Sequence, residues 1–81
     1  MRDVKLTILK VLAGVHHQHK FNLLGRGSDQ GIVEAELGTR FNPDERHMAA
    51  VAFAELETAG FIRPTYEDLI APESWVAITV H

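Results

Sequence analysis

Residues 42–64, NPDERHMAAVAFAELETAGFIRP, decide the fold of this chain. Asn42 is a good N-cap residue, Pro43 suits the first helical position, and acidic residues follow in the first turn, where they favour the helix dipole. Gly60 supplies the left-handed residue that commonly ends a helix. These signals predict a helix over residues 43–59, with a buried face of Ala49, Ala52, Phe53, Leu56 and Ala59.

Two β-strands are predicted after this helix. Residues 61–63 have strand-forming side chains, and Pro64 restricts their strand to a sheet edge or to an early end. Residues 75–80 alternate, which places Val76, Ile78 and Val80 on one face of a second strand. The two strands suggest a hairpin, although the connection around residues 66–74 is too long for a tight turn.

Two further helices are predicted before residue 42. The first begins at about residue 3 with Asp3 as its N-cap and has an apolar stripe that includes Val15; its end falls between Ala13 and His19. Residues 25–31 are rich in glycine and form a loop. A short second helix follows, with Ser28 or Asp29 as candidate cap and Gly38 at its end.

Length and composition fit one small domain spanning residues 1–81, either alone or as part of a longer protein, and the predicted helices and strands make its class α+β. Apolar residues make up 46% of the chain, which is enough for a modest core. The absence of cysteine removes disulfides, thiolate metal sites and a cysteine nucleophile. The sequence has no signal-peptide or membrane-spanning pattern, so a cytoplasmic location with no membrane contact is the expectation.

The segment from Phe53 to Ile62, with the strand from Trp75 to Thr79, resembles a winged helix-turn-helix domain of the transcription-regulator kind. In that family a Leu-x-x-x-Gly-Phe-Ile junction, here residues 56–62, joins the recognition helix to the first strand of the wing, with Phe61 and Ile62 both entering the sheet on the core. The resemblance covers residues 3–80. It implies a three-helix winged helix with a two- or three-stranded antiparallel wing.

The same resemblance implies DNA binding, with helix 43–59 in the major groove. Its contact residues would be Arg40, Arg46 and His47 near the start of that helix and Arg63 on the wing.

The charge distribution disfavours DNA as the partner. Residues 1–41 carry six basic and four acidic groups, net +2, whereas residues 42–81 carry two basic and seven acidic groups, net −5. Affinity for DNA comes largely from neutralising phosphates, and the acidic half holds both implied contact elements. The alternative is therefore an acidic winged-helix module that binds a protein or forms a homodimer without binding DNA.

Other chemical patterns in the sequence have simpler interpretations. His16, His17 and His19 lie close together, but no carboxylate completes a metal site, so a polar helix end is favoured over a metal ligand set. The glycine-rich loop at residues 25–31 matches neither the Walker spacing nor the Gly-x-Gly-x-x-Gly spacing of phosphate-binding loops. It is therefore interpreted as a connector. Ser28 and Ser74 have no nucleophile context, so we expect no catalytic residues, no cofactor and no enzyme activity.

Overall fold

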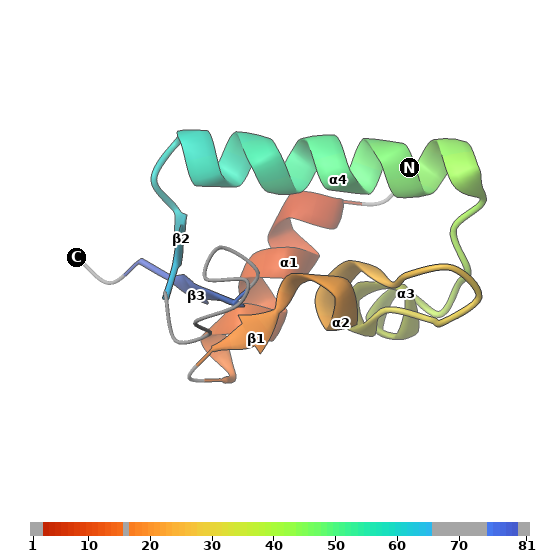
Figure 1. Cartoon of the computed structure of the whole chain (residues 1–81), viewed down its shortest axis with the longest axis horizontal. Helices are drawn as coiled ribbons and strands as arrows, with labels where there is room; N and C mark the ends of the chain where they lie inside the picture. The colour runs from red at the N-terminus through yellow and green to blue at the C-terminus, as the bar shows by residue number, and fades with distance from the viewer. Residues whose placement is uncertain (1–2, 16, 66–74, 80–81) are drawn as a thin grey trace.

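The computed structural model describes residues 3–15, 17–65 and 75–79 (Figure 1). This part of the chain forms four helices and three strands. They are α1 (Val4–Ala13), β1 (Gln18–His19), α2 (Lys20–Leu24), α3 (Ile32–Leu37), α4 (Pro43–Thr58), β2 (Ile62–Pro64) and β3 (Trp75–Ile78). The predicted α+β class is confirmed.

The predicted start and end of α1 are confirmed within their stated range. The Asp3 side chain accepts a hydrogen bond from the backbone N–H of Leu6, 3.0 Å long, which caps the first turn. The helix stops at Ala13, and Gly14 is its C-cap. Val15 was predicted on the apolar stripe, but it lies beyond the helix and is 40% exposed, because the helical periodicity ends before it.

The segment before α3 differs from the prediction in two ways. Residues 20–24 form the short helix α2, which was not predicted. The N-cap of α3 is Gly31, so the assignment of Ser28 or Asp29 as its cap was wrong. Arg26 and Asp29 instead close a tight turn on each other through two backbone hydrogen bonds of 3.3 and 2.9 Å, which holds residues 26–29 away from the helix start.

Helix α4 begins where the sequence predicts and ends at Thr58, one residue before the predicted end. The Asn42 side chain accepts from the backbone N–H of Glu45 (2.8 Å), and the Glu45 side chain accepts from the N–H of Asn42 (3.1 Å), which together form a capping box. At the other end Gly60 has φ +84°, and Phe61 N–H donates to the Leu56 carbonyl over 2.9 Å. Ala59, predicted to be buried, is exposed because the helix has already ended there.

The three strands form one antiparallel sheet in the order β1-β3-β2. Strand β2 is an edge strand that ends at Pro64, as predicted. Two strands follow the helices and β1 joins them from between α1 and α2, an arrangement consistent with a three-stranded wing. Val80, predicted to extend β3, lies outside the described residues.

The predicted place of Phe61 in the core was wrong. The strand begins at Ile62, and Phe61 is 51% exposed because the turn at Gly60 directs only Ile62 inward. Its carbonyl still accepts from the N–H of Thr79 over 2.9 Å, so the backbone of Phe61 joins the strands although its side chain does not join the core.

One apolar core connects the helices to the sheet. Helix α4 lies across α1 and beside α2, and the sheet closes the end of the molecule where α4 turns into β2 (Figure 1). The buried residues are Val4, Ile8, Leu12, Leu23, Leu24, Val33, Phe41, Ala49, Phe53, Leu56, Ile62 and Val76. Among the described residues, none of the helices is long and apolar enough to cross a membrane.

Candidate functional site

Helix α4 presents a complete face to solvent. Its inner side packs Ala49, Phe53 and Leu56 into the core, so the residues on the opposite side point outward. We define the outer face of α4 as the exposed residues Asp44, His47, Met48, Val51, Ala54, Glu55 and Thr58. Apolar and acidic residues dominate this face, which carries no lysine or arginine.

Two large apolar side chains stand at the centre of the outer face. Met48 is 52% exposed and Val51 is 44% exposed. The carboxylate of Glu55 at the rim accepts from the Nζ of Lys5 on α1 over 3.1 Å, in an ion pair that is itself exposed. Scattered exposed apolar residues are common, but neighbouring ones on one helix face mark a surface that can dock another chain.

A buried carboxylate organises the segment that leads into α4. The side chain of Glu34 is fully buried and accepts backbone hydrogen bonds from Gly31 N–H (2.9 Å) and Phe41 N–H (2.7 Å). Two guanidinium groups lie beside it, with Arg46 Nη2 at 3.4 Å and Arg40 Nε at 3.8 Å. Glu34 therefore ties the start of α3 to the residues that precede α4.

Burial raises the pKa of the Glu34 carboxyl, but the backbone N–H groups of Gly31 and Phe41 and the charges of Arg46 and Arg40 lower it further than burial raises it. The net pKa is below the ordinary value of 4.5. Glu34 is thus ionised at neutral pH, as its two arginine neighbours require.

Two of the four predicted DNA-contact residues are held by contacts within the chain. Arg40 Nη2 donates to the Ser28 carbonyl over 2.6 Å, and Arg46 Nη1 donates to the Gly27 carbonyl over 2.7 Å. Both guanidinium groups also face Glu34. The two arginines therefore hold the 25–31 loop against the start of α4 and share the charge of one buried acid.

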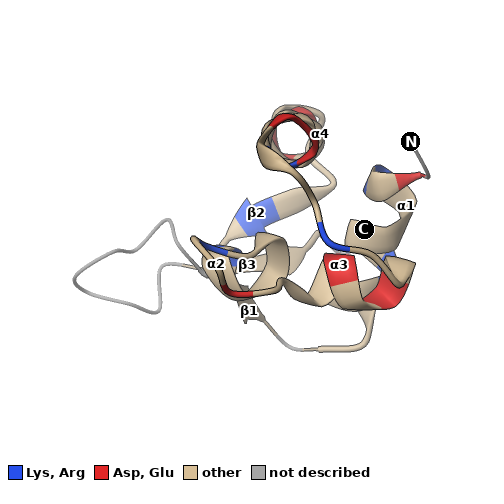
Figure 2. Ribbon diagram, turned by 90° about the vertical axis from the view of Figure 1, so that its right-hand side faces the viewer, with Lys and Arg blue, Asp and Glu red and all other residues tan. Residues whose placement is uncertain are grey.

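The other two predicted contact residues take no part in these contacts around Glu34. His47 is exposed on the outer face of α4, and Arg63 is exposed on β2. In Figure 2 the basic positions on β2, on α2 and on the connection before α4 lie on separate elements, and both α3 and α4 carry acidic positions. The structure thus brings Arg40 and Arg46 together, but it does not unite all four residues in one basic surface.

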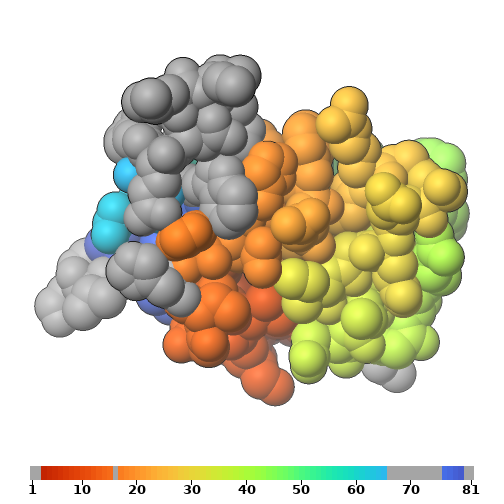
Figure 3. Space-filling model, turned by 60° about the horizontal axis from the view of Figure 1, so that its bottom comes forward, coloured from red at the N-terminus to blue at the C-terminus, as the bar shows by residue number. Residues whose placement is uncertain are grey.

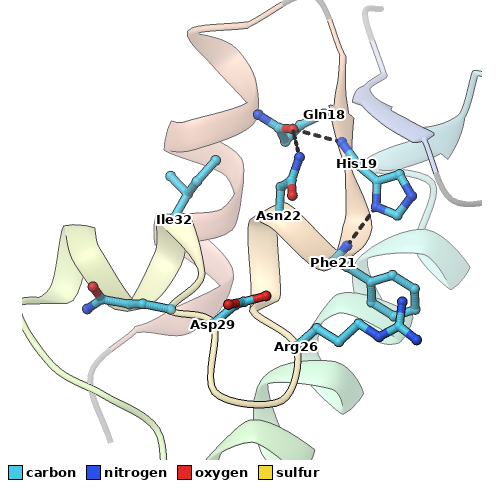
Figure 4. A pocket seen from close by; sticks show the side chains of 8 residues that line it. Gln18, His19, Phe21, Asn22, Arg26, Asp29 and Ile32 are labelled. Atoms are coloured by element: carbon cyan, nitrogen blue, oxygen red, sulfur yellow. Dashed lines mark hydrogen bonds between the residues drawn. The ribbon is translucent and has the colours of Figure 1, made fainter.

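Further cations gather around α2. The Nζ of Lys20 lies 5.9 Å from the centre of the Phe53 ring, and the guanidinium of Arg26 lies 4.9 Å from that of Phe21. Lys20 and Phe21 belong to α2 and Arg26 to the loop after it, whereas Phe53 is a buried residue of α4. Figure 3 shows β1, α2, the 25–31 loop and α3 side by side on one face of the molecule. Figure 4 shows an open hollow in this region, where Arg26 and Phe21 stand on one side and Asp29 and Ile32 on the other.

The histidines near β1 have local structural contacts. His19 is the N-cap of α2, and its Nδ1 accepts from the N–H of Phe21 over 3.1 Å. Within residues 3–15, 17–65 and 75–79, no group of three histidine, cysteine or acidic side chains is placed to hold a metal ion. His16 lies outside those ranges.

Sequence reasoning missed Glu34. The available signal was its position three residues after Gly31, where an acidic side chain can accept from the cap N–H. A glutamate in a predicted helix is normally assigned to solvent, so the sequence did not reveal its burial.

Comparison with known proteins adds no relative to this description. No family model matches the chain, and no curated protein or solved structure matches it either.

Proposed function

We propose that this chain is a winged-helix domain that binds a protein partner through the outer face of α4. The order of α1, β1, α3, α4, β2 and β3 and the sheet order β1-β3-β2 support the winged-helix assignment. On this assignment α4 takes the place of the recognition helix, β2 and β3 form the wing, and α2 is an additional turn before α3.

The composition of the outer face of α4 carries the proposal of a protein partner. A helix that enters the major groove needs cations to neutralise the phosphates on both sides of it. The single arginine of α4, Arg46, is half-buried and faces Glu34, and the exposed side chains nearest the helix start include Asp44. An apolar centre with acidic neighbours instead suits contact with another protein.

The first experiment measures DNA affinity. Fluorescence anisotropy of mixed-sequence duplex DNA, titrated with the 81-residue chain at about 50 mM and about 150 mM salt, should show no saturable binding. Saturable binding that weakens steeply between the two salt concentrations would overturn the proposal.

The second experiment tests directly whether a protein contacts the outer face of α4. A photo-crosslinking amino acid is placed at position 51 on the outer face and, as a matched control, at the exposed position 36 on α3, in cells that naturally make the protein. We expect a protein adduct of defined mass from position 51 and none from position 36. Equal adducts from both positions, or adducts with DNA alone, would contradict a specific protein site on α4.

DNA binding is the second candidate function, favoured by the cations on the α2 side of α4. Lys20 and Arg46 line a groove between α2 and α4, and Arg26 lies nearby on the Phe21 ring. If DNA binds there, Lys20→Ala and Arg26→Ala should each weaken binding. Each should also reduce the slope of log affinity against log salt concentration by about one. Arg46→Ala is a poorer test because Arg46 also holds the 25–31 loop.

A further inference from the structure

The outer face of α4 has the geometry of a helix-packing stripe. Its members are spaced three or four residues apart along the helix and therefore form one continuous strip. Met48, Val51 and Ala54 occupy the middle, and polar or charged residues occupy both ends. Neighbouring apolar side chains on one helix face can pack against a second helix.

The strip is complementary to itself when two copies meet in antiparallel orientation. If Val51 faces Val51 of the second copy, Met48 faces Ala54 of that copy, and the apolar centres cover each other. The same register sets the imidazole of His47 opposite the carboxylate of Glu55, and Asp44 opposite Thr58. Each contact occurs twice, as twofold symmetry requires.

Charge selects this orientation over the parallel one. In a parallel pair Asp44 would face Asp44 and the two carboxylates would repel each other, and Glu55 would face Glu55, whose charge the Nζ of Lys5 already offsets in part. In the antiparallel pair no carboxylate of the strip faces another carboxylate. The carboxylate of Asp44 at the start of α4 thereby acts against the parallel arrangement.

We propose that the partner of the outer face of α4 is a second copy of this chain, in a twofold dimer whose axis passes beside Val51. This inference rests on the proposed function, since it names the protein that occupies the same surface. A single pair of helices is a small interface, below about 1,200 Å², so the dimer dissociates in the micromolar range.

The first test is the mass of the chain in solution as a function of concentration. Light scattering on the 81-residue chain should move from the 9.0 kDa monomer to twice that mass as concentration rises through the micromolar range. Val51→Glu places two carboxylates at the axis and should weaken the dimer at least about tenfold. Val15→Glu is the matched control, because Val15 is similarly exposed at 40% but follows α1 outside α4, and it should dimerise normally.

The second test uses disulfide formation to identify which positions of the two α4 helices face each other. It is possible because the chain has no cysteine of its own. Under mild oxidation Val51→Cys should crosslink in high yield, since its two copies meet at the axis. Thr58→Cys should not, because the two copies of position 58 lie about 21 Å apart along the antiparallel helices. The double variant Asp44→Cys/Thr58→Cys should regain the crosslink between copies.

These outcomes separate the dimer from the protein site on which it rests. A chain that stays monomeric up to about 1 mM, or equal crosslinking of Val51→Cys and Thr58→Cys, overturns the dimer. If position 51 then still gives an adduct with a different protein in cells, the proposed interaction surface stands without the dimer. Saturable, salt-dependent DNA binding overturns the proposed function separately.

Discussion

At the scale of single residues, Glu34 contributes most to the architecture of the site. A buried carboxylate is costly unless hydrogen bonds and opposite charges compensate for its lost hydration. Glu34 has both, from two backbone N–H groups and two arginines. The compensation also explains why the guanidinium groups of Arg40 and Arg46 lie beside Glu34, since each offsets part of that buried charge.

Replacing Glu34 should destabilise the protein strongly. In Glu34→Gln the amide NH₂ would face a backbone N–H, and the charge shared by Arg40 and Arg46 would lose its counterion. We expect a loss of about 3 kcal/mol in the free energy of unfolding, measured by urea denaturation. Glu36→Gln, on the same helix but exposed, should change it by less than about 0.5 kcal/mol. Equal effects of the two substitutions would contradict the structural role of Glu34.

The low pKa of Glu34 makes part of the folding stability depend on pH. A carboxyl with a lowered pKa in the folded state contributes stability that is fully present above its unfolded value of 4.5 and disappears as pH falls through the folded pKa. The stability difference between the natural chain and Glu34→Gln should therefore be constant from about pH 7 to about pH 5 and shrink below 4.5. Urea titrations across that range measure it, and a difference that grows with acid would refute the assignment.

At the scale of elements, the end of α4 directs the chain into the sheet. The left-handed turn at Gly60 lets Phe61 N–H reach back to Leu56 and aims Ile62 into the core. Helix and strand are therefore coupled through one backbone conformation. The space around Gly60 is open, so its conformation alone restricts substitution.

Two glycine substitutions should have opposite effects. Gly60→Ala must hold a side chain at φ +84° and should cost about 1 kcal/mol. Gly14→Ala occupies a right-handed position at φ −89° without a close contact, and should leave stability unchanged or raise it by about 0.5 kcal/mol. Thermal unfolding of both variants compares them, and equal losses would show that the turn at Gly60 is not restrictive.

The elements differ in how far local sequence predicted them. The start and end of α4 followed from Asn42, Pro43 and Gly60, because caps act over three or four residues. Strand β1 has two residues and exists only through its pairing with β3, in which Gln18 lies opposite Val76. Such a strand has no local pattern that sequence reasoning could detect.

At the scale of the whole molecule, the helices and the sheet share one core. Ile8 and Leu12 of α1 belong to the same buried cluster as Ile62 of β2 and Val76 of β3. Neither layer has enough apolar surface of its own to remain folded without the other.

The chain should therefore unfold in one step. We expect the helical signal in circular dichroism and the hydrogen-exchange protection of β3 to be lost at the same urea concentration. Leu12→Ala in α1 and Val76→Ala in β3 should each lower both midpoints together. We expect the free energy of unfolding to fall by roughly 2–4 kcal/mol for Leu12→Ala and by roughly 1–2 kcal/mol for Val76→Ala. Two separate transitions would show that the helices and the sheet are independent.

The sequence alone determined the α+β class, the limits of α4 and the charge difference between the two halves of the chain. Each depends on neighbouring residues or on composition, so no knowledge of the folded contacts was needed. The burial of Glu34, the approach of Arg40 and Arg46 to it and the exposure of the outer face of α4 depend on the folded contacts. The physical reason is distance along the chain, because the energy of burying a charge or exposing an apolar face depends on which remote segments pack against it.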